Sequence, residues 1–151
     1  MKHSIYALVT LLILGCASRK ELGKVNETSI TVNSNLEKDF ITATLGESKT
    51  SDAITINDAQ INGNIMYLVV EYSGGCQNHS FELTGSYAVA KSIPPQRAIQ
   101  LYHNANGDNC RALITDTIIV NIEALATTPM PGSEIFLNLK GYGKQLKYIY
   151  Q

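Results

Sequence analysis

Alternating hydrophobic and polar residues run through much of the chain from residue 53 onward. Residues 79–84 and 99–103 alternate between ring-bearing or apolar side chains and polar ones, a period that is typical of strands with one buried face. Residues 65–72 are almost continuously apolar, which predicts a central strand covered on both faces. No long stretch has the period of a helix. We therefore expect this part of the chain to consist of strands.

Turn-forming residues separate these runs, notably at residues 62–64, 74–75 and 106–107. Residues 135–139 and 146–150 predict a final hairpin. Residues 110–122 predict one long strand with a bend or bulge near Asp116, because an unbroken strand of that length is unusual. The spacing of the strands predicts an all-β fold, an antiparallel, immunoglobulin-like β-sandwich of about seven to nine strands. A small β-barrel is the alternative.

The N-terminus has a different pattern. Residues 5–14 carry no charge and are mostly apolar. As a helix this segment would extend about 15 Å, which is too short for a hydrocarbon core of about 30 Å. We interpret residues 1–15 as a signal peptide.

Residues 12–16 read Leu-Ile-Leu-Gly-Cys and resemble the lipobox of bacterial lipoproteins. The resemblance implies that residues 1–15 are removed and that Cys16 is acylated with chains such as palmitate. Ala17 follows the cysteine in place of the aspartate linked to inner-membrane retention, which favours a lipid anchor in the outer membrane of the cell envelope. An ordinary cleaved secretory signal that happens to contain a cysteine is the alternative.

The polar residues that follow predict a flexible tether over residues 16–35 and a folded domain over residues 36–151. Within that domain, residues 36–45 are expected to form a first strand or a short helix. The chain has 151 residues, of which 44% are apolar and 17% charged, with a net charge of -1. These values predict one folded domain and exclude a largely disordered chain. The charge balance also argues against a nucleic-acid-binding protein.

Apart from Cys16, the mature chain has two cysteines and two histidines, and they fall into two pairs. Two residues lie between Cys76 and His79, and six lie between His103 and Cys110. Each pair lies beside turn residues at an expected strand end. Strand alternation places each histidine on the same face as large apolar neighbours. Both imidazoles are therefore predicted to point inward, near one rim of the sandwich.

We expect a disulfide between Cys76 and Cys110, because disulfides persist in exported proteins. It would close a loop of about 35 residues and stabilise the fold by about 3–4 kcal/mol in the chain-entropy estimate. The histidines would then be packing residues that donate hydrogen bonds to carbonyls.

An alternative is a zinc or copper site with Cys76, His79, His103 and Cys110 as ligands. The shorter spacing is common in zinc sites, whereas the longer one is not. The two readings exclude each other, because an oxidised cysteine pair offers no thiolate. A cysteine nucleophile with a histidine base is a further alternative.

The region Tyr72-Ser-Gly-Gly-Cys-Gln-Asn-His-Ser-Phe, with Pro94-Pro95 and residues 103–110, resembles a group of uncharacterised lipoproteins from Bacteroidota-type bacteria. The resemblance spans roughly residues 65–125. It implies no known activity, but it favours the view that the cysteines and histidines act as a unit.

Two weaker patterns suggest ligands. Asn104, Asn106 and Asp108 stand at alternate positions, as in calcium loops, but the glycine and the position-twelve residue do not match that motif. Tyr142, Tyr148 and Tyr150 suggest a carbohydrate platform near the C-terminus, although strand aromatics usually pair across a sheet.

The sequence contains none of the common hydrolase, nucleotide-binding or zincin motifs. We therefore expect no catalytic residues and no cofactor, unless the zinc or copper alternative holds. The expected function is that of a non-catalytic envelope module, anchored to the membrane through Cys16, that binds an unidentified envelope protein or small ligand or has a structural role.

Overall fold

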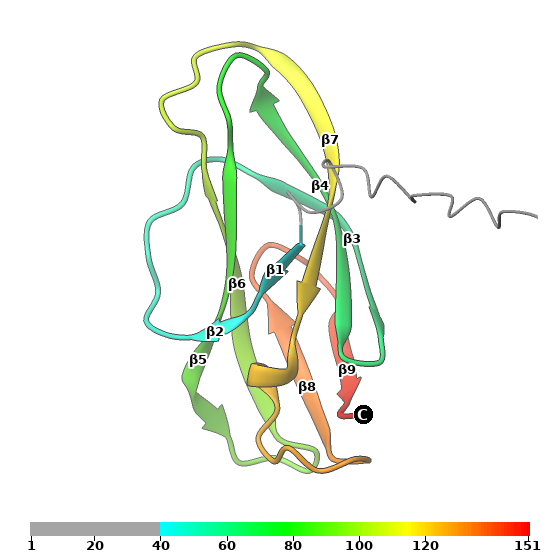
Figure 1. The fold of residues 1–151 in the computed structure, drawn as a ribbon. Coiled ribbons are helices and arrows are strands. Elements are labelled where there is room, and N and C mark those ends of the chain that lie inside the picture. The colour runs from blue at the N-terminus through cyan, green and yellow to red at the C-terminus, as the bar shows by residue number, and fades with distance from the viewer. Residues whose placement is uncertain (1–39) are drawn as a thin grey trace, which may run out of the picture. The chain divides into compact units, whose positions relative to one another are not determined.

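The computed structural model describes residues 40–151, which form a sandwich of two β-sheets (Figure 1). Sheet A has the strand order β1-β7-β4-β3, and sheet B has the order β2-β5-β6-β8-β9. The strands are β1 (Phe40–Thr42), β2 (Thr44–Leu45), β3 (Thr55–Asn62), β4 (Ile65–Gly74), β5 (Ser80–Ala90), β6 (Gln96–Asn104), β7 (Ala112–Asn121), β8 (Glu134–Leu139) and β9 (Gln145–Ile149).

This architecture confirms the predicted sandwich and its number of strands, and the described strands do not close into a barrel. Residues 40–45 form strands rather than a helix. The predicted signal peptide, Cys16 and the predicted tether over residues 16–35 lie outside the described residues.

Three strand pairs are parallel, which corrects the expectation of antiparallel pairing throughout. The pairs are β1 with β7, β2 with β5, and β6 with β8. β1 and β2 belong to one short segment that passes from sheet A to sheet B at the buried residue Ala43. β6 and β8 can run in the same direction because β7 and the 3-10 turn η1 (Glu123–Leu125) lie between them in the chain, as a parallel pair requires a crossover.

The core lies between the two sheets and takes alternate residues from each strand. β4 buries Met66, Leu68 and Val70 completely, whereas Tyr67 between them is 39% exposed. The prediction that this strand is covered on both faces is therefore wrong, because its outer face meets solvent. Sheet B contributes the opposing core side chains, which are Leu83, Ile99, Leu101, Ile135, Leu137, Leu139 and Tyr148.

The predicted turns are present, but the register irregularities lie in other strands than predicted. Gly63 and the Asn106-Gly107 pair have positive φ angles, as tight turns require. β7 pairs with β4 over its full length without a register shift, so no bulge occurs at Asp116. The irregularities lie in β3, between Ile56 and Asp58, and in β5, between Gly85 and Val89. β3 is an edge strand, where bulges are common.

η1 closes one end of the core. Leu125 from this turn is fully buried, and its backbone oxygen accepts a hydrogen bond from Nε of Arg97 at 3.0 Å. Nη1 of Arg97 donates to the backbone oxygen of Ser86 in β5. Burial lowers the pKa of Arg97, although an arginine stays charged in a protein. No helix within residues 40–151 is long and apolar enough to cross a membrane.

The packing of η1 against β5 depends on the absence of a side chain at Gly85. A Cβ atom there would lie 2.6 Å from Cδ2 of Leu125 and 3.0 Å from Cδ of Arg97. We expect Gly85→Ala to lower the free energy of unfolding by about 1–3 kcal/mol, as overpacking does. Urea denaturation measures the effect. Gly143→Ala is the control, because no atom lies within 4 Å of its added Cβ. Equal midpoints for the two variants would contradict this packing.

Candidate functional site

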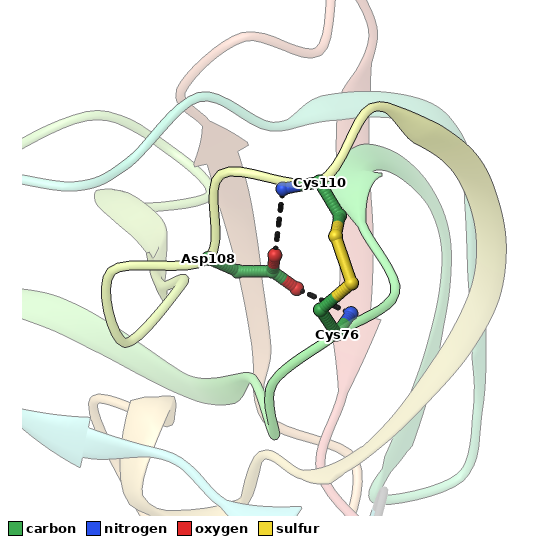
Figure 2. Close-up of side chains that lie close together, drawn as sticks. All are labelled: Cys76, Asp108 and Cys110. Atoms are coloured by element: carbon green, nitrogen blue, oxygen red, sulfur yellow. Dashed lines mark hydrogen bonds between the residues drawn. A yellow bond between two sulfur atoms is a disulfide. The ribbon is translucent and has the colours of Figure 1, made fainter.

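Cys76 and Cys110 form a disulfide, as the sequence predicts (Figure 2). Their Cα atoms are 5.9 Å apart, although 34 positions separate them in the chain; this Cα distance is ordinary for a disulfide. Cys76 lies two positions after the end of β4, and Cys110 lies two positions before β7, the neighbour of β4 in sheet A.

The disulfide joins two places where the chain passes between the sheets. Residues 75–79 lead from β4 in sheet A to β5 in sheet B, and residues 105–111 lead from β6 in sheet B back to β7 in sheet A. Both crossings lie at the same rim of the sandwich. We call the side chains gathered there, Cys76, His79, His103, Asp108 and Cys110, the rim cluster.

Asp108 connects the two crossings through hydrogen bonds. Its Oδ2 accepts from the backbone N–H groups of Cys76, at 2.8 Å, and Gln77, at 2.9 Å. Its Oδ1 accepts from the backbone N–H of Cys110 at 2.8 Å. Figure 2 shows this carboxylate between the backbones of the two cysteines. The hydrogen bond from Cys110, followed by those from Cys76 and Gln77, holds the pKa of Asp108 well below its usual range.

Sequence reasoning missed this role of Asp108. The calcium-like spacing of Asn104, Asn106 and Asp108 drew attention to the residue for another reason. Oδ1 of Asn104 accepts from the backbone N–H of Asn106 at 2.9 Å, which is a local turn contact. The available signal was a carboxylate two positions before a cysteine, where Asp commonly accepts from the backbone two residues on.

The two histidines point inward, as strand alternation predicts. His79 is 8% exposed and His103 is 3% exposed. Their rings lie among those of Tyr72 and Phe81, with ring-centre separations of 4.8 to 5.4 Å. Gly74 leaves room for the imidazole of His79, because a Cβ atom at Gly74 would lie 2.4 Å from its Cε1. Gly74, which lies outside the rim cluster, therefore allows the imidazole of His79 to occupy its place in the cluster.

A chain of contacts runs through both imidazoles. Nδ1 of His103 donates to the backbone oxygen of Ala53 at 3.0 Å. Nε2 of His103 lies 2.7 Å from Nδ1 of His79, and Nε2 of His79 lies 3.2 Å from Oδ2 of Asp108. The carbonyl and the ionised carboxylate can only accept. All three contacts are hydrogen bonds only if the four ring nitrogens carry three protons, one more than two neutral imidazoles hold.

Burial and neighbouring charge differ between the two imidazoles. Desolvation is the main cause that lowers the pKa of His103. His79 faces the Asp108 carboxylate, at the other end of the chain of contacts, with its Nε2 3.2 Å from Oδ2.

The four residues of the metal alternative do meet at one rim, but they are not arranged as free ligands. The sulfur atoms of Cys76 and Cys110 are bonded to each other, and facing nitrogens of His79 and His103 lie at hydrogen-bonding distance. Cys76, Asp108 and Cys110 place potential ligand atoms within 4.8 Å of one another, yet disulfide sulfurs are not thiolates. A zinc or copper site, or a cysteine nucleophile, would require the reduced protein.

A groove of about 910 Å³ lies over the outer face of sheet B, and sequence reasoning did not predict it. β5, β6 and β8 contribute its floor, and residues 46–48 and 140–145 contribute its walls. Of the tyrosines considered for a carbohydrate platform, Tyr142 lines this groove. Tyr148 is fully buried in the core, and Tyr150 is partly buried against it. Tyr87 and Tyr102 line the groove in their place.

Amide side chains are linked across the floor of the groove and beside it. Oε1 of Gln96 accepts from Nδ2 of Asn138 at 3.2 Å and from Nε2 of Gln145 at 3.1 Å. Oε1 of Gln100 accepts from Oγ of Ser48 at 3.2 Å and from Nζ of Lys140 at 3.3 Å. Each amide therefore has a fixed orientation before any ligand arrives.

Together, the fold and the rim define a β-sandwich protein with a disulfide between its crossings. No protein-family model matches the chain, and no curated protein matches it. Among solved structures, the chain is similar to a NigD-like immunity protein from Bacteroides caccae, with a TM-score of 0.57 and 14% identity. The match covers 74% of this chain and 64% of that protein.

Two further structures have lower similarity. A DUF1344 protein of unknown function from Bacteroides vulgatus has a TM-score of 0.44 and 14% identity, and the match covers 75% of this chain and 56% of that one. A putative toxin-related protein from Parabacteroides distasonis has a TM-score of 0.45 and 14% identity, with 72% and 59% covered.

The chain spans less than two thirds of the length of each of these proteins. At this identity, the similarity to the Bacteroides caccae protein shows the fold alone. All three proteins come from Bacteroidota.

Replacing both Cys76 and Cys110 with serine tests the contribution of the disulfide. The bond restricts the unfolded chain over 34 positions, so we expect the variant to lose about 3–4 kcal/mol of unfolding free energy in the chain-entropy estimate. Urea denaturation of the oxidised wild type, the reduced wild type and the variant measures this loss. The reduced wild type should match the variant. An unchanged midpoint would show that the bond does not constrain the fold.

Asp108→Asn tests the carboxylate between the crossings. Because the folded-state pKa of Asp108 is depressed, its contribution is fully present above the unfolded value of about 4 and is lost as the pH falls below it. We expect the variant to be less stable at neutral pH, and the difference from wild type to narrow below about pH 4. Thermal melting across this range measures the effect.

Glu134→Gln is the control for that experiment, because Glu134 forms a surface ion pair with Lys147 and such pairs contribute little. Parallel pH profiles for Asp108→Asn and wild type would contradict the role of Asp108.

Proposed function

We propose that the mature chain is a lipid-anchored, non-catalytic binding module of the bacterial cell envelope, held at the outer membrane by acyl chains on Cys16. Its binding surface is the groove over the outer face of sheet B. The groove is the observation that carries the binding role. The lipobox-like residues 12–16 support the anchor, and the disulfide suits a location outside the cytoplasm.

The shape of the groove supports a binding role. Its volume of about 910 Å³ lies within the range of about 300–1,000 Å³ that is usual for small-ligand sites. Tyr87 lines it and is 66% exposed, so a large ring stands in solvent without packing against the core. Exposed aromatic side chains beside fixed polar groups are typical of sites that bind a ligand.

The chemistry of the lining supports a non-catalytic role. Among the described residues that line the groove, Glu47 is the one carboxylate, and the others are amides, hydroxyls, lysines, tyrosines and small residues. General acid–base catalysis by paired carboxylates needs a second such group. At the rim, the histidines are engaged with each other, with Ala53 and with Asp108.

The anchor is tested by Cys16→Ser in a host that exports and acylates lipoproteins. We expect wild type in the membrane fraction, with an N-terminal peptide whose mass shows acyl chains on Cys16. The variant should lose the acyl chains and leave the membrane fraction, since several acyl chains on one residue give stable anchoring.

The double serine variant of Cys76 and Cys110 is the matched control, because it removes cysteines but keeps Cys16; it should remain membrane-bound. A wild-type chain that is cleaved without acylation would instead support the ordinary secretory signal.

A further inference from the structure

We infer that the ligand of the groove over sheet B is an uncharged glycan chain. This inference rests on the proposed binding function and names its ligand class. It depends on the groove and not on the acyl anchor.

The floor of the groove is a row of outward-facing polar side chains. Thr84 pairs in register with Gln100, and Ala98 pairs with Asn138. Their neighbours along the strands, such as Leu83 and Ile99, face the core, so these four residues face outward. Gln100 and Asn138 each offer an amide, whereas the hydroxyl of Thr84 is buried and donates to Oε1 of Glu82 at 3.2 Å. Ala98 has a short side chain, which leaves the centre of the floor low.

The amides present donors to a ligand. The oxygen of Gln100 is occupied by Ser48 and Lys140, and this fixes the amide so that its Nε2 remains to donate. Sugar hydroxyls both donate and accept hydrogen bonds, as do amides and hydroxyl side chains. A ligand rich in hydroxyls can therefore satisfy this floor at many points.

Tyrosine rings provide the second element of glycan recognition. Tyr87 follows Gly85 at the irregular part of β5 and stands 66% exposed. Tyr142 lies in the opposite wall, and its hydroxyl donates to Oδ1 of Asp58 at 3.0 Å, which holds the ring in place. A tyrosine combines a flat apolar ring with a polar tip. Such rings match the apolar C–H faces of sugar rings, while the amides match the hydroxyl edges.

The charge of the lining favours an uncharged ligand. The cations Lys140 and Lys144 lie on the wall with the anion Glu47, and Lys140 is engaged with Gln100. The lining therefore lacks the cluster of arginines and lysines that anionic polymers require. An apolar peptide fits less well, because it would cover the amides without satisfying their hydrogen bonds.

Binding to immobilised oligosaccharides tests the inference. The protein is the full chain with Cys16→Ser, which removes acylation. The neutral probes are oligosaccharides of glucose, mannose, galactose and xylose, and the anionic probes are sulfated and uronic-acid oligosaccharides. We expect binding to at least one neutral probe. We expect Tyr87→Ala and Gln100→Ala each to weaken it about tenfold, the size expected for a lost aromatic contact or hydrogen bond.

Tyr67→Ala is the matched control, because Tyr67 is an exposed tyrosine on the outer face of sheet A; it should bind like wild type. Thermal melting confirms that each variant is folded, and shifts in the side-chain amide NMR signals of Gln100 and Asn138 place the glycan in the groove independently of any variant.

Absence of neutral-glycan binding, binding only to anionic probes, or binding unaffected by Tyr87→Ala and Gln100→Ala would each overturn the inference. Acylation of Cys16 is measured separately, so the envelope anchor can stand when the glycan inference fails. If the chain is not acylated but still binds neutral glycans through the groove, the glycan inference stands and the envelope anchor fails.

Discussion

The sandwich depends on the connection between two of its inter-sheet crossings at one rim. The disulfide joins these crossings covalently, and the Asp108 carboxylate binds backbone N–H groups from both. These backbone groups would otherwise lack partners where the chain leaves the sheets. Among the described residues, no buried side-chain nitrogen or oxygen lacks a hydrogen bond. Covalent and polar contacts therefore close the rim, where the apolar core ends.

β6 relates the rim to the groove. On its core face it carries His103, which is stacked on Phe81 and bonded to Ala53. On its outer face it carries Gln100 in the floor of the groove. β5 and β6 lie side by side as paired strands (Figure 1), and the stacking of His103 on Phe81 joins them at the rim. A rigid scaffold of this kind lowers the entropy lost when fixed polar groups bind a ligand.

The sequence predicted the local features well, because they depend on neighbouring residues. Alternation placed His79 and His103 inside, turn residues marked the β3–β4 hairpin, and the two cysteines indicated a disulfide. The parallel pair of β6 and β8 and the uninterrupted register of β7 with β4 were not predicted, because strand pairing joins residues far apart in the chain. The groove was missed for the same reason, since its lining comes from several strands and two loops. Asp108 was considered only as part of a calcium-like loop pattern, because its partners Cys76 and Gln77 lie about thirty positions away.

The mass of the purified mature chain, alkylated before and after reduction and accompanied by elemental analysis, tests the central claim most directly. The structure predicts a chain lighter than its reduced form by the two hydrogens of one disulfide. Cys76 and Cys110 should accept no alkylating reagent before reduction, and the protein should carry no stoichiometric zinc or copper. Free thiols on both cysteines together with one equivalent of either metal would contradict this account, and would make Cys76, His79, His103 and Cys110 a metal centre.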